Sequence, residues 1–206
     1  MSKGQKGASL LDRWQSVLAL AVVCFLLQSC SQDLEWTATD ISGLMPNLQL
    51  ELTSDEGRAV NQDEFLGKTN IVFFGFTYCP DICPTTLAKV RQAIHQLSEE
   101  QRQQLNVLFI SVDPERDTPE HLKRYISSFG PEFKGLTGTQ EQLKSLVRNY
   151  RVTYGYGKPD EDGNYDVSHS SAIFIFDPSG AVRLLAKDSI PTEGLAQDLE
   201  RLMETS

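Results

Sequence analysis

Three short runs of apolar residues stand out along the chain, each bounded by polar or glycine-containing segments. They span residues 71–76, 107–112 and 172–176 and are rich in Val, Ile, Leu and Phe. Runs of this length are too short for a typical helix and favour strands that are buried on both faces. Residues 48–52 alternate instead between leucine and polar side chains, and the turn residues of 54–57 follow them. That pattern predicts an amphipathic β-hairpin.

Helical periodicity fills the gaps between these runs. The apolar stripes predict helices at 84–101, after the start signal at 118–120, around 143–147 and at 195–203. The turn residues 177–180 join the last apolar run to another one, which predicts a second hairpin. The order β-α-β-α-β-β-α indicates an α/β, thioredoxin-like fold. It has a central, mostly parallel sheet flanked by helices, with the first hairpin at its N-terminus.

The first 29 residues have the pattern of a targeting segment. Three basic residues precede the apolar run 14–27, which would reach roughly 21 Å as a helix and is shorter than the ~30 Å hydrocarbon core. A signal peptide at 1–29 fits better than a spanning helix, with an uncleaved short anchor as the alternative. Residues 27–30, Leu-Gln-Ser-Cys, resemble the lipobox of bacterial lipoproteins, in which Cys30 would carry the lipid.

This N-terminus predicts three parts and a location. A signal peptide at 1–29 is followed by a polar tether at 30–46 and by the thioredoxin-like domain at 47–206. We expect the protein in the bacterial cell envelope, lipid-anchored, with the domain facing the periplasm or another extracytoplasmic space. The net charge is −9, and the first 29 residues contribute +2, which leaves −11 for the rest. An acidic body repels phosphate backbones, so nucleic acid is not expected as a partner.

The exported domain keeps a single pair of cysteines, because Cys24 lies in the signal peptide and Cys30 would be lipidated. This pair, Cys79 and Cys83, lies in the sequence GFTYCPDICPTTL, where a proline follows each cysteine. Prolines disfavour the helical conformation in the preceding residue, so we expect both sulfurs in a tight loop that caps a helix starting at Pro84. A helix N-terminus favours thiolates, which either bind a metal or exchange with disulfides.

A metal site would need a third ligand, and the chain has three histidines. His95 and His121 lie beside predicted helical stripes and are expected on helix surfaces. His169 follows a polar loop and directly precedes a buried strand, on the side where a thioredoxin-like domain presents its cysteines. From the residues alone, His169 is either a metal ligand or a histidine at a strand edge. A structural disulfide or packed core cysteines are the remaining alternatives for the pair, although closing so short a loop would stabilise little.

Four segments are similar to the Sco/SenC family of copper-binding, thioredoxin-fold proteins. They are FFGFTYCPDICPTTLAKV, FISVDPERDTPEHLKRY, GLTGTQEQLKSLVRNYRVTY and VSHSSAIFIFDPSG, and the resemblance covers about residues 48–203. It implies that Cys79, Cys83 and His169 bind copper, as Cu(I) or Cu(II), with one ion per chain. Soft thiolates suit Cu(I) and imidazole suits Cu(II), and the affinity order favours copper over zinc.

The chain differs from the family pattern beside the histidine, where family members often have Asp and this chain has Ser168. Asp166 is the nearest alternative carboxylate, and Asp113 in the SVDPERDTPE motif is a weaker candidate for the surroundings of the site. Whether either carboxylate supports the histidine stays open at this point.

The resemblance implies a copper metallochaperone that delivers copper to the binuclear centre of cytochrome c oxidase subunit II during assembly. Another copper-requiring exported protein would serve as a partner of the same kind. The alternative is an enzyme, a thiol-disulfide oxidoreductase in which Cys79 and Cys83 reduce an exported client. Thioredoxin chemistry typically uses a two-residue spacer between its cysteines. The three-residue spacer and the nearby histidine therefore favour copper binding over the oxidoreductase. A disulfide would remove both thiolates, so copper loading requires a thiol reductant.

Overall fold

The fold was analysed in a computed structural model, which describes residues 35–161 and 164–205. Its main sheet has eight strands in the order β1-β10-β9-β4-β5-β6-β2-β3, and β7 and β8 form a separate two-stranded sheet. The strands are β1 Thr39–Asp40, β2 Glu51–Ser54, β3 Ala59–Asn61, β4 Thr69–Gly75, β5 Leu105–Ser111, β6 Phe133–Thr137, β7 Tyr154–Tyr156, β8 Val167–His169, β9 Ile173–Phe176 and β10 Val182–Ala186. The helices are η1 Gln62–Glu64, α2 Ile82–Ile94, α3 Glu99–Gln103, α4 Pro119–Ile126, α5 Gln140–Asn149 and α6 Thr192–Glu204.

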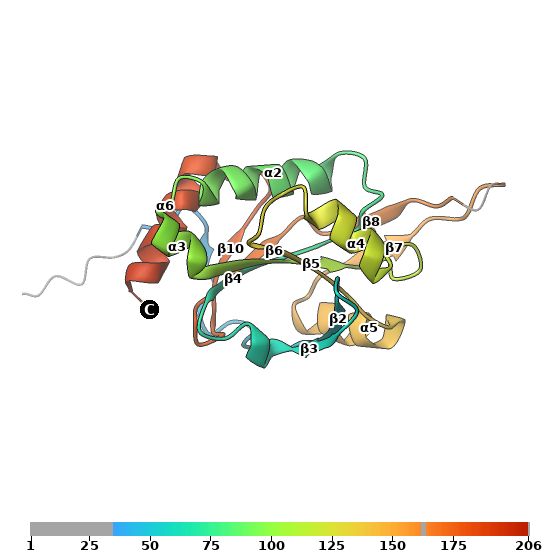
Figure 1. Cartoon of the computed structure of the whole chain (residues 1–206), viewed down its shortest axis with the longest axis horizontal. Coiled ribbons are helices and arrows are strands. Elements are labelled where there is room, and N and C mark those ends of the chain that lie inside the picture. The colour runs from blue at the N-terminus through green and yellow to red at the C-terminus, as the bar shows by residue number, and fades with distance from the viewer. Residues whose placement is uncertain (1–34, 162–163, 206) are drawn as a thin grey trace, which may run out of the picture. The chain divides into compact units, whose positions relative to one another are not determined.

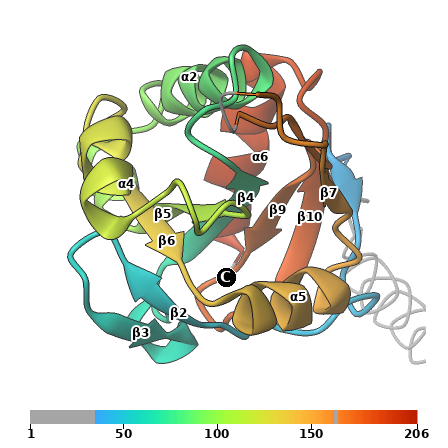
Figure 2. The ribbon, with the colours of Figure 1, turned by 90° about the vertical axis from the view of Figure 1, so that its right-hand side faces the viewer.

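The helices cover both faces of the main sheet. Figures 1 and 2 show α2, α4 and α6 on one face and α5 on the other. Every residue of the central strands β4 and β5 is buried, which is why their sequences read as continuous apolar runs. Within the described residues, no helix is both long and apolar enough to cross a bilayer.

The α/β, thioredoxin-like class is confirmed, but the sheet is mixed rather than mostly parallel. Within the described part of the chain, parallel pairing is confined to β4 with β5 and β5 with β6. Strand β9 runs antiparallel to β4, and β10 runs antiparallel to β9. The apolar run of β9 could not reveal its direction, because a strand covered on both faces is apolar whichever way it runs.

Several predicted elements have different limits in the structure. The segment expected as one helix at 84–101 forms two helices. Helix α2 ends at Ile94, and Ser98 caps the start of α3 with a capping box. Strand β6 was not predicted, since Lys134 and Gly135 interrupt its apolar pattern. The hairpin of β2 and β3 and the hairpin of β9 and β10 are both confirmed.

Residues 36–46 belong to the folded body rather than to a free tether. Strand β1 pairs with β10, and the compact unit begins at Trp36. The backbone N–H groups of Thr37 and Ala38 donate to the buried carboxylate of Asp198 at 3.0 and 2.8 Å. These backbone contacts need few apolar side chains, so the polar composition of the segment concealed them. The predicted signal peptide and Cys30 lie outside the described residues.

Candidate metal centre

The two cysteines lie at the carboxyl end of β4, where an α/β sheet commonly places its functional groups. Cys79 lies in the loop after β4, and Cys83 lies in the first turn of α2. The expectation that both precede the helix is therefore wrong for Cys83, since α2 begins at Ile82. Pro84 fits inside this first turn because the backbone N–H that proline lacks would have no helical partner there. That fit outweighs the tendency of a residue before proline to leave the helical conformation.

The two sulfurs differ in environment. Cys83 is completely buried, whereas Cys79 is half-buried, and both are free thiols in the structure. Burial raises the pKa of the Cys83 thiol well above its ordinary range, which opposes the thiolate that the helix start favours. The backbone N–H of Cys83 donates to the Cys79 sulfur at 3.4 Å. The first turn of the helix therefore provides a donor to Cys79 while it buries Cys83.

Gly75, the last residue of β4, gives the Cys83 sulfur its space. A Cβ atom at this position would lie 2.8 Å from the Cys83 Sγ and 2.7 Å from the Phe109 ring. Both distances are too short for a real contact, so a larger residue would displace the sulfur or the ring. Sequence reasoning did not single out this glycine. The sequence feature that could have identified it is its position at the end of an apolar strand, where glycine often marks the close approach of another group to the backbone.

His169 is the last residue of β8 and lies against the cysteine pair. Its Nε2 atom is 3.2 Å from the Cys83 Sγ, and its Nδ1 atom lies 3.0 Å from the carbonyl oxygen of Ser170. A carbonyl only accepts, so Nδ1–H is the donor and the lone pair of Nε2 faces the sulfurs. Burial lowers the pKa of His169, which favours the neutral imidazole that a metal requires. The ligand atoms of Cys79, Cys83 and His169 all lie within 4.8 Å of one another.

Ser168, Asp166 and Asp113 all contact residues other than His169. Ser168 donates from its hydroxyl to the Gly155 carbonyl at 3.4 Å, and Asp166 accepts through its backbone carbonyl from Gly157. The carbonyl of Ser170 accepts the hydrogen bond from the imidazole Nδ1–H that a neighbouring carboxylate would otherwise accept. Asp113 is fully buried and binds Arg116 and Tyr165, so its contribution to the site is indirect.

The other two histidines lie on helices, as predicted. His95 is exposed at the end of α2. His121 is half-buried, and its ring stacks on Tyr78 with the centroids 5.2 Å apart. His121 therefore belongs to the surroundings of the cysteine loop, which the surface-histidine expectation did not foresee.

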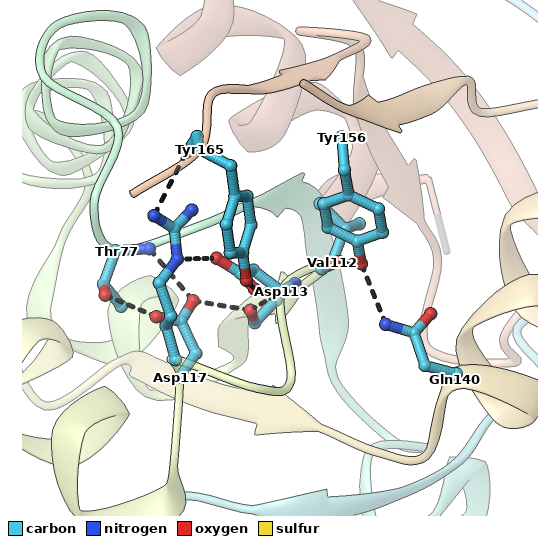
Figure 3. Close-up of polar contacts among 9 residues, drawn as sticks. Thr77, Val112, Asp113, Asp117, Gln140, Tyr156 and Tyr165 are labelled. Carbon is cyan, nitrogen blue, oxygen red and sulfur yellow. Dashed lines mark hydrogen bonds and ion pairs between the residues drawn. The ribbon is translucent and has the colours of Figure 1, made fainter. Parts of the chain in front are cut away.

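A second buried carboxylate, Asp117, fixes the start of the cysteine loop. It accepts hydrogen bonds from the backbone N–H and the hydroxyl of Thr77, at 3.0 and 2.5 Å, and from the Ser111 hydroxyl at 2.5 Å (Figure 3). Burial raises the pKa of Asp117, although these three donors oppose the shift. Thr77 is thereby tied to the end of β5, two residues before Cys79. The sequence pattern gave no sign of this contact.

The fold and the cluster together define a thioredoxin-fold protein with a Cys₂His site for a soft or borderline metal ion. The sequence model of the SCO1/SenC family matches residues 47–204, and the chain belongs to that family. The SCO2 homologue of Bos taurus mitochondria is 45% identical over 130 residues, which cover 63% of this chain and 49% of that protein. The match thus spans about half the length of this mitochondrial relative.

Two solved structures extend the comparison to copper. ScoI of Arabidopsis thaliana with copper bound has a TM-score of 0.70 and 33% identity, and the match covers 78% of this chain and 99% of that one. ScoI of Bradyrhizobium japonicum with copper bound has a TM-score of 0.69 and 35% identity, with 76% and 99% covered. Two sulfurs and one imidazole also suit copper chemically. The chain therefore belongs to a family with copper-bound members, and it has a Cys₂His cluster whose ligand atoms suit the same metal.

Proposed function

We propose that the protein is a copper metallochaperone that delivers copper to the binuclear centre of subunit II of a respiratory cytochrome c oxidase during assembly. Cys79, Cys83 and His169 would hold one copper ion as cargo. The family resemblance carries the choice of target.

The observation that carries the proposal is the convergence of three soft or borderline ligand atoms within 4.8 Å at an accessible place. Cys79 and His169 are half-buried, and Tyr78 and Ile82 beside the pair are exposed. A cargo site has to be open to the ligands of a partner, whereas a structural metal site is usually closed. The two thiolates suit Cu(I), and the imidazole adds a ligand that Cu(II) prefers.

Copper titration of the reduced protein tests this assignment. We expect one tightly bound copper per chain, with sulfur-to-copper charge-transfer absorption for Cu(II). The Cys79→Ser and Cys83→Ser variants should each lose this absorption or change its energy. Cu(II) binding without any charge-transfer band, or with the same band in all three proteins, would contradict the sulfur ligands.

A second candidate is a thiol-disulfide oxidoreductase, which the unequal burial of the cysteines favours. The half-buried Cys79 thiolate would attack a client disulfide and release one client thiol. The Cys83 sulfur, after losing its proton, would then attack the Cys79 sulfur and release the second thiol. Two electrons pass to the client, and a thiol reductant restores the Cys79–Cys83 pair. Reductase activity that depends on both cysteines, survives His169→Ala and shows no dependence on copper would favour this candidate.

We further propose that Cys30 carries a lipid that anchors the domain at the outer side of a bacterial membrane. The support is the short apolar segment that ends in the lipobox-like Leu-Gln-Ser-Cys. Fatty-acid labelling of cells should mark the natural protein and leave Cys30→Ala unlabelled, while the copper site stays intact. Equal label in both proteins would contradict lipidation at Cys30.

A further inference from the structure

His169 is carried by an element that is not part of the main sheet. Among the described strands, β7 and β8 pair only with each other, with Tyr154 opposite His169, and Figure 1 shows them beside the ends of the central strands. A lone two-stranded hairpin is only marginally stable in water. The position of His169 relative to the sulfurs therefore depends on the contacts that attach this hairpin to the body.

Tyr165 attaches the segment directly before β8 to the body. Its hydroxyl donates to Asp113 Oδ1 at 2.7 Å, and its backbone carbonyl accepts from Arg116 Nη1 at 3.1 Å (Figure 3). The Arg116 guanidinium also lies 3.8 Å from the centroid of the Tyr165 ring. The residue four positions before His169 is thus held by its ring, its hydroxyl and its backbone.

Arg116 is itself fixed from the body side. Its Nε atom donates to Asp113 Oδ2 at 2.5 Å, and the Asp113 side chain is almost completely buried. A buried carboxylate of this kind stays bound to its partner, because separating them would leave a charge without compensation. Asp113 therefore holds both the guanidinium and the Tyr165 hydroxyl in one place.

The same guanidinium also contacts the cysteine side of the site. Its central carbon lies 5.0 Å from the centroid of the Tyr78 ring and 6.0 Å from that of Phe76. Tyr78 directly precedes Cys79, and the Phe76 ring meets the His169 ring edge-on at 5.7 Å. Arg116 thus contacts the loop that carries Cys79 and the hairpin that carries His169.

We propose that Arg116, bound to Asp113 and Tyr165, is a positioning residue that keeps the His169 imidazole against the two cysteine sulfurs. The inference rests on the proposed role of His169 as a copper ligand. Lysine keeps the positive charge, but it lacks the planar fork that reaches Asp113 and the Tyr165 carbonyl while stacking on a ring. The Arg116→Lys variant therefore keeps the positive charge and removes the planar guanidinium.

The test is the affinity of the reduced protein for Cu(II) and for Cu(I) in a double-mutant cycle. Arg116→Lys should weaken Cu(II) binding about tenfold and Cu(I) binding by less than about threefold, because Cu(I) needs mainly the thiolates. In the His169→Ala background the same substitution should change Cu(II) affinity by less than about twofold, because no imidazole remains to be positioned. The nitrogen coupling in the electron paramagnetic resonance spectrum of bound Cu(II) should weaken in Arg116→Lys.

A second variant, Tyr165→Phe, keeps the test informative if Arg116→Lys folds poorly, and Arg183→Lys and Tyr150→Phe are controls. Tyr165→Phe removes only the hydroxyl contact with Asp113 and should weaken Cu(II) binding about threefold. Arg183→Lys is the matched control, because Arg183 pairs with the buried Asp177 at the other end of β9, and it should leave both affinities unchanged. Tyr150→Phe is the control for the tyrosine, since its hydroxyl donates to Asn47 outside the hairpin.

The outcomes separate the two proposals. If His169→Ala weakens Cu(II) binding but Arg116→Lys and Tyr165→Phe do not, the positioning role is wrong and the ligand assignment stands. Equal losses of Cu(I) and Cu(II) affinity in Arg116→Lys, or the same loss in the His169→Ala background, would also overturn it. If His169→Ala leaves Cu(II) affinity unchanged, the ligand assignment fails and the positioning role with it.

Discussion

The metal centre combines two regions that are built very differently. Cys83 lies in the first turn of α2 against β4 and β5, where every surrounding residue of the two strands is buried. His169 lies on a two-stranded hairpin that is attached through a few polar and aromatic contacts. A well-packed core resists small displacements, whereas a hairpin of this kind opens at lower cost in free energy.

This difference assigns separate tasks to the ligands. The core side holds the Cys83 sulfur by close packing against β4 and β5, whereas the hairpin side holds the His169 nitrogen through the contacts of Tyr165 and Arg116. The predictions below test each side in turn.

Oxidation of the cysteine pair should have the largest effect on copper binding, because it removes both thiolates at once. Protein in which Cys79 and Cys83 form a disulfide should bind no copper, and reductant should restore binding without refolding. The measurement is copper retained after gel filtration, with the redox state established by mass spectrometry. Tight copper binding by fully oxidised protein would contradict the assigned sulfur ligands.

The two thiols should differ strongly in reactivity. Cys83 should react with iodoacetamide at least about tenfold more slowly than the half-buried Cys79, because its sulfur is buried and burial raises the pKa of its thiol. Peptide mapping after timed alkylation of the reduced, metal-free protein gives both rates. Comparable rates would mean that the first turn of α2 opens readily.

Gly75→Ala should reduce stability on the core side by about 1–3 kcal/mol, because the new methyl group overlaps the Phe109 ring and the Cys83 sulfur. Gly155→Ala in β7 is the matched control. Its methyl group would meet Ser168 at an ordinary 3.4 Å, and its effect should stay within about 0.5 kcal/mol. Urea unfolding of the three proteins measures the difference. Equal stabilities would show that the space beside Cys83 is not tightly packed.

Tyr156→Phe should have the smallest effect on global stability. The Tyr156 hydroxyl donates to the Val112 carbonyl and accepts from Gln140, but the side chain is partly exposed (Figure 3). We expect a loss of about 0.5 kcal/mol in urea unfolding, with faster hydrogen exchange confined to the hairpin. Exchange that accelerates equally in β4 and β5 would show that hairpin and sheet open together.

The sequence predicted the parts of the molecule that depend on burial and local chemistry. Apolar runs located β4, β5 and β9, and the capping signal Thr118-Pro119 located α4. The cysteine motif with the later histidine located the cluster, because few other residues on the chain can bind a soft metal. The direction of β9 and the existence of β6 were not predicted, because neither produces a distinct apolar pattern in the sequence.

The missed parts of the site depend on contacts between distant residues. Arg116 and Asp113 lie in a motif that drew attention, but nothing in their spacing indicates that they meet Tyr165 almost fifty residues later. At Cys83 the helix start favours a thiolate while burial raises the pKa of the thiol, and the sequence does not give the depth of burial. Similarly, the polar composition of residues 36–46 concealed an edge strand.

The most direct test of copper delivery is oxidase activity in cells that carry His169→Ala, measured across a series of copper concentrations. We expect oxidase activity to fail at limiting copper and to recover partly when copper is added, because two sulfur ligands suffice for Cu(I). Cells with Cys79→Ser or Cys83→Ser should recover less at every concentration. Normal oxidase activity of His169→Ala cells at the lowest copper concentration would contradict the account.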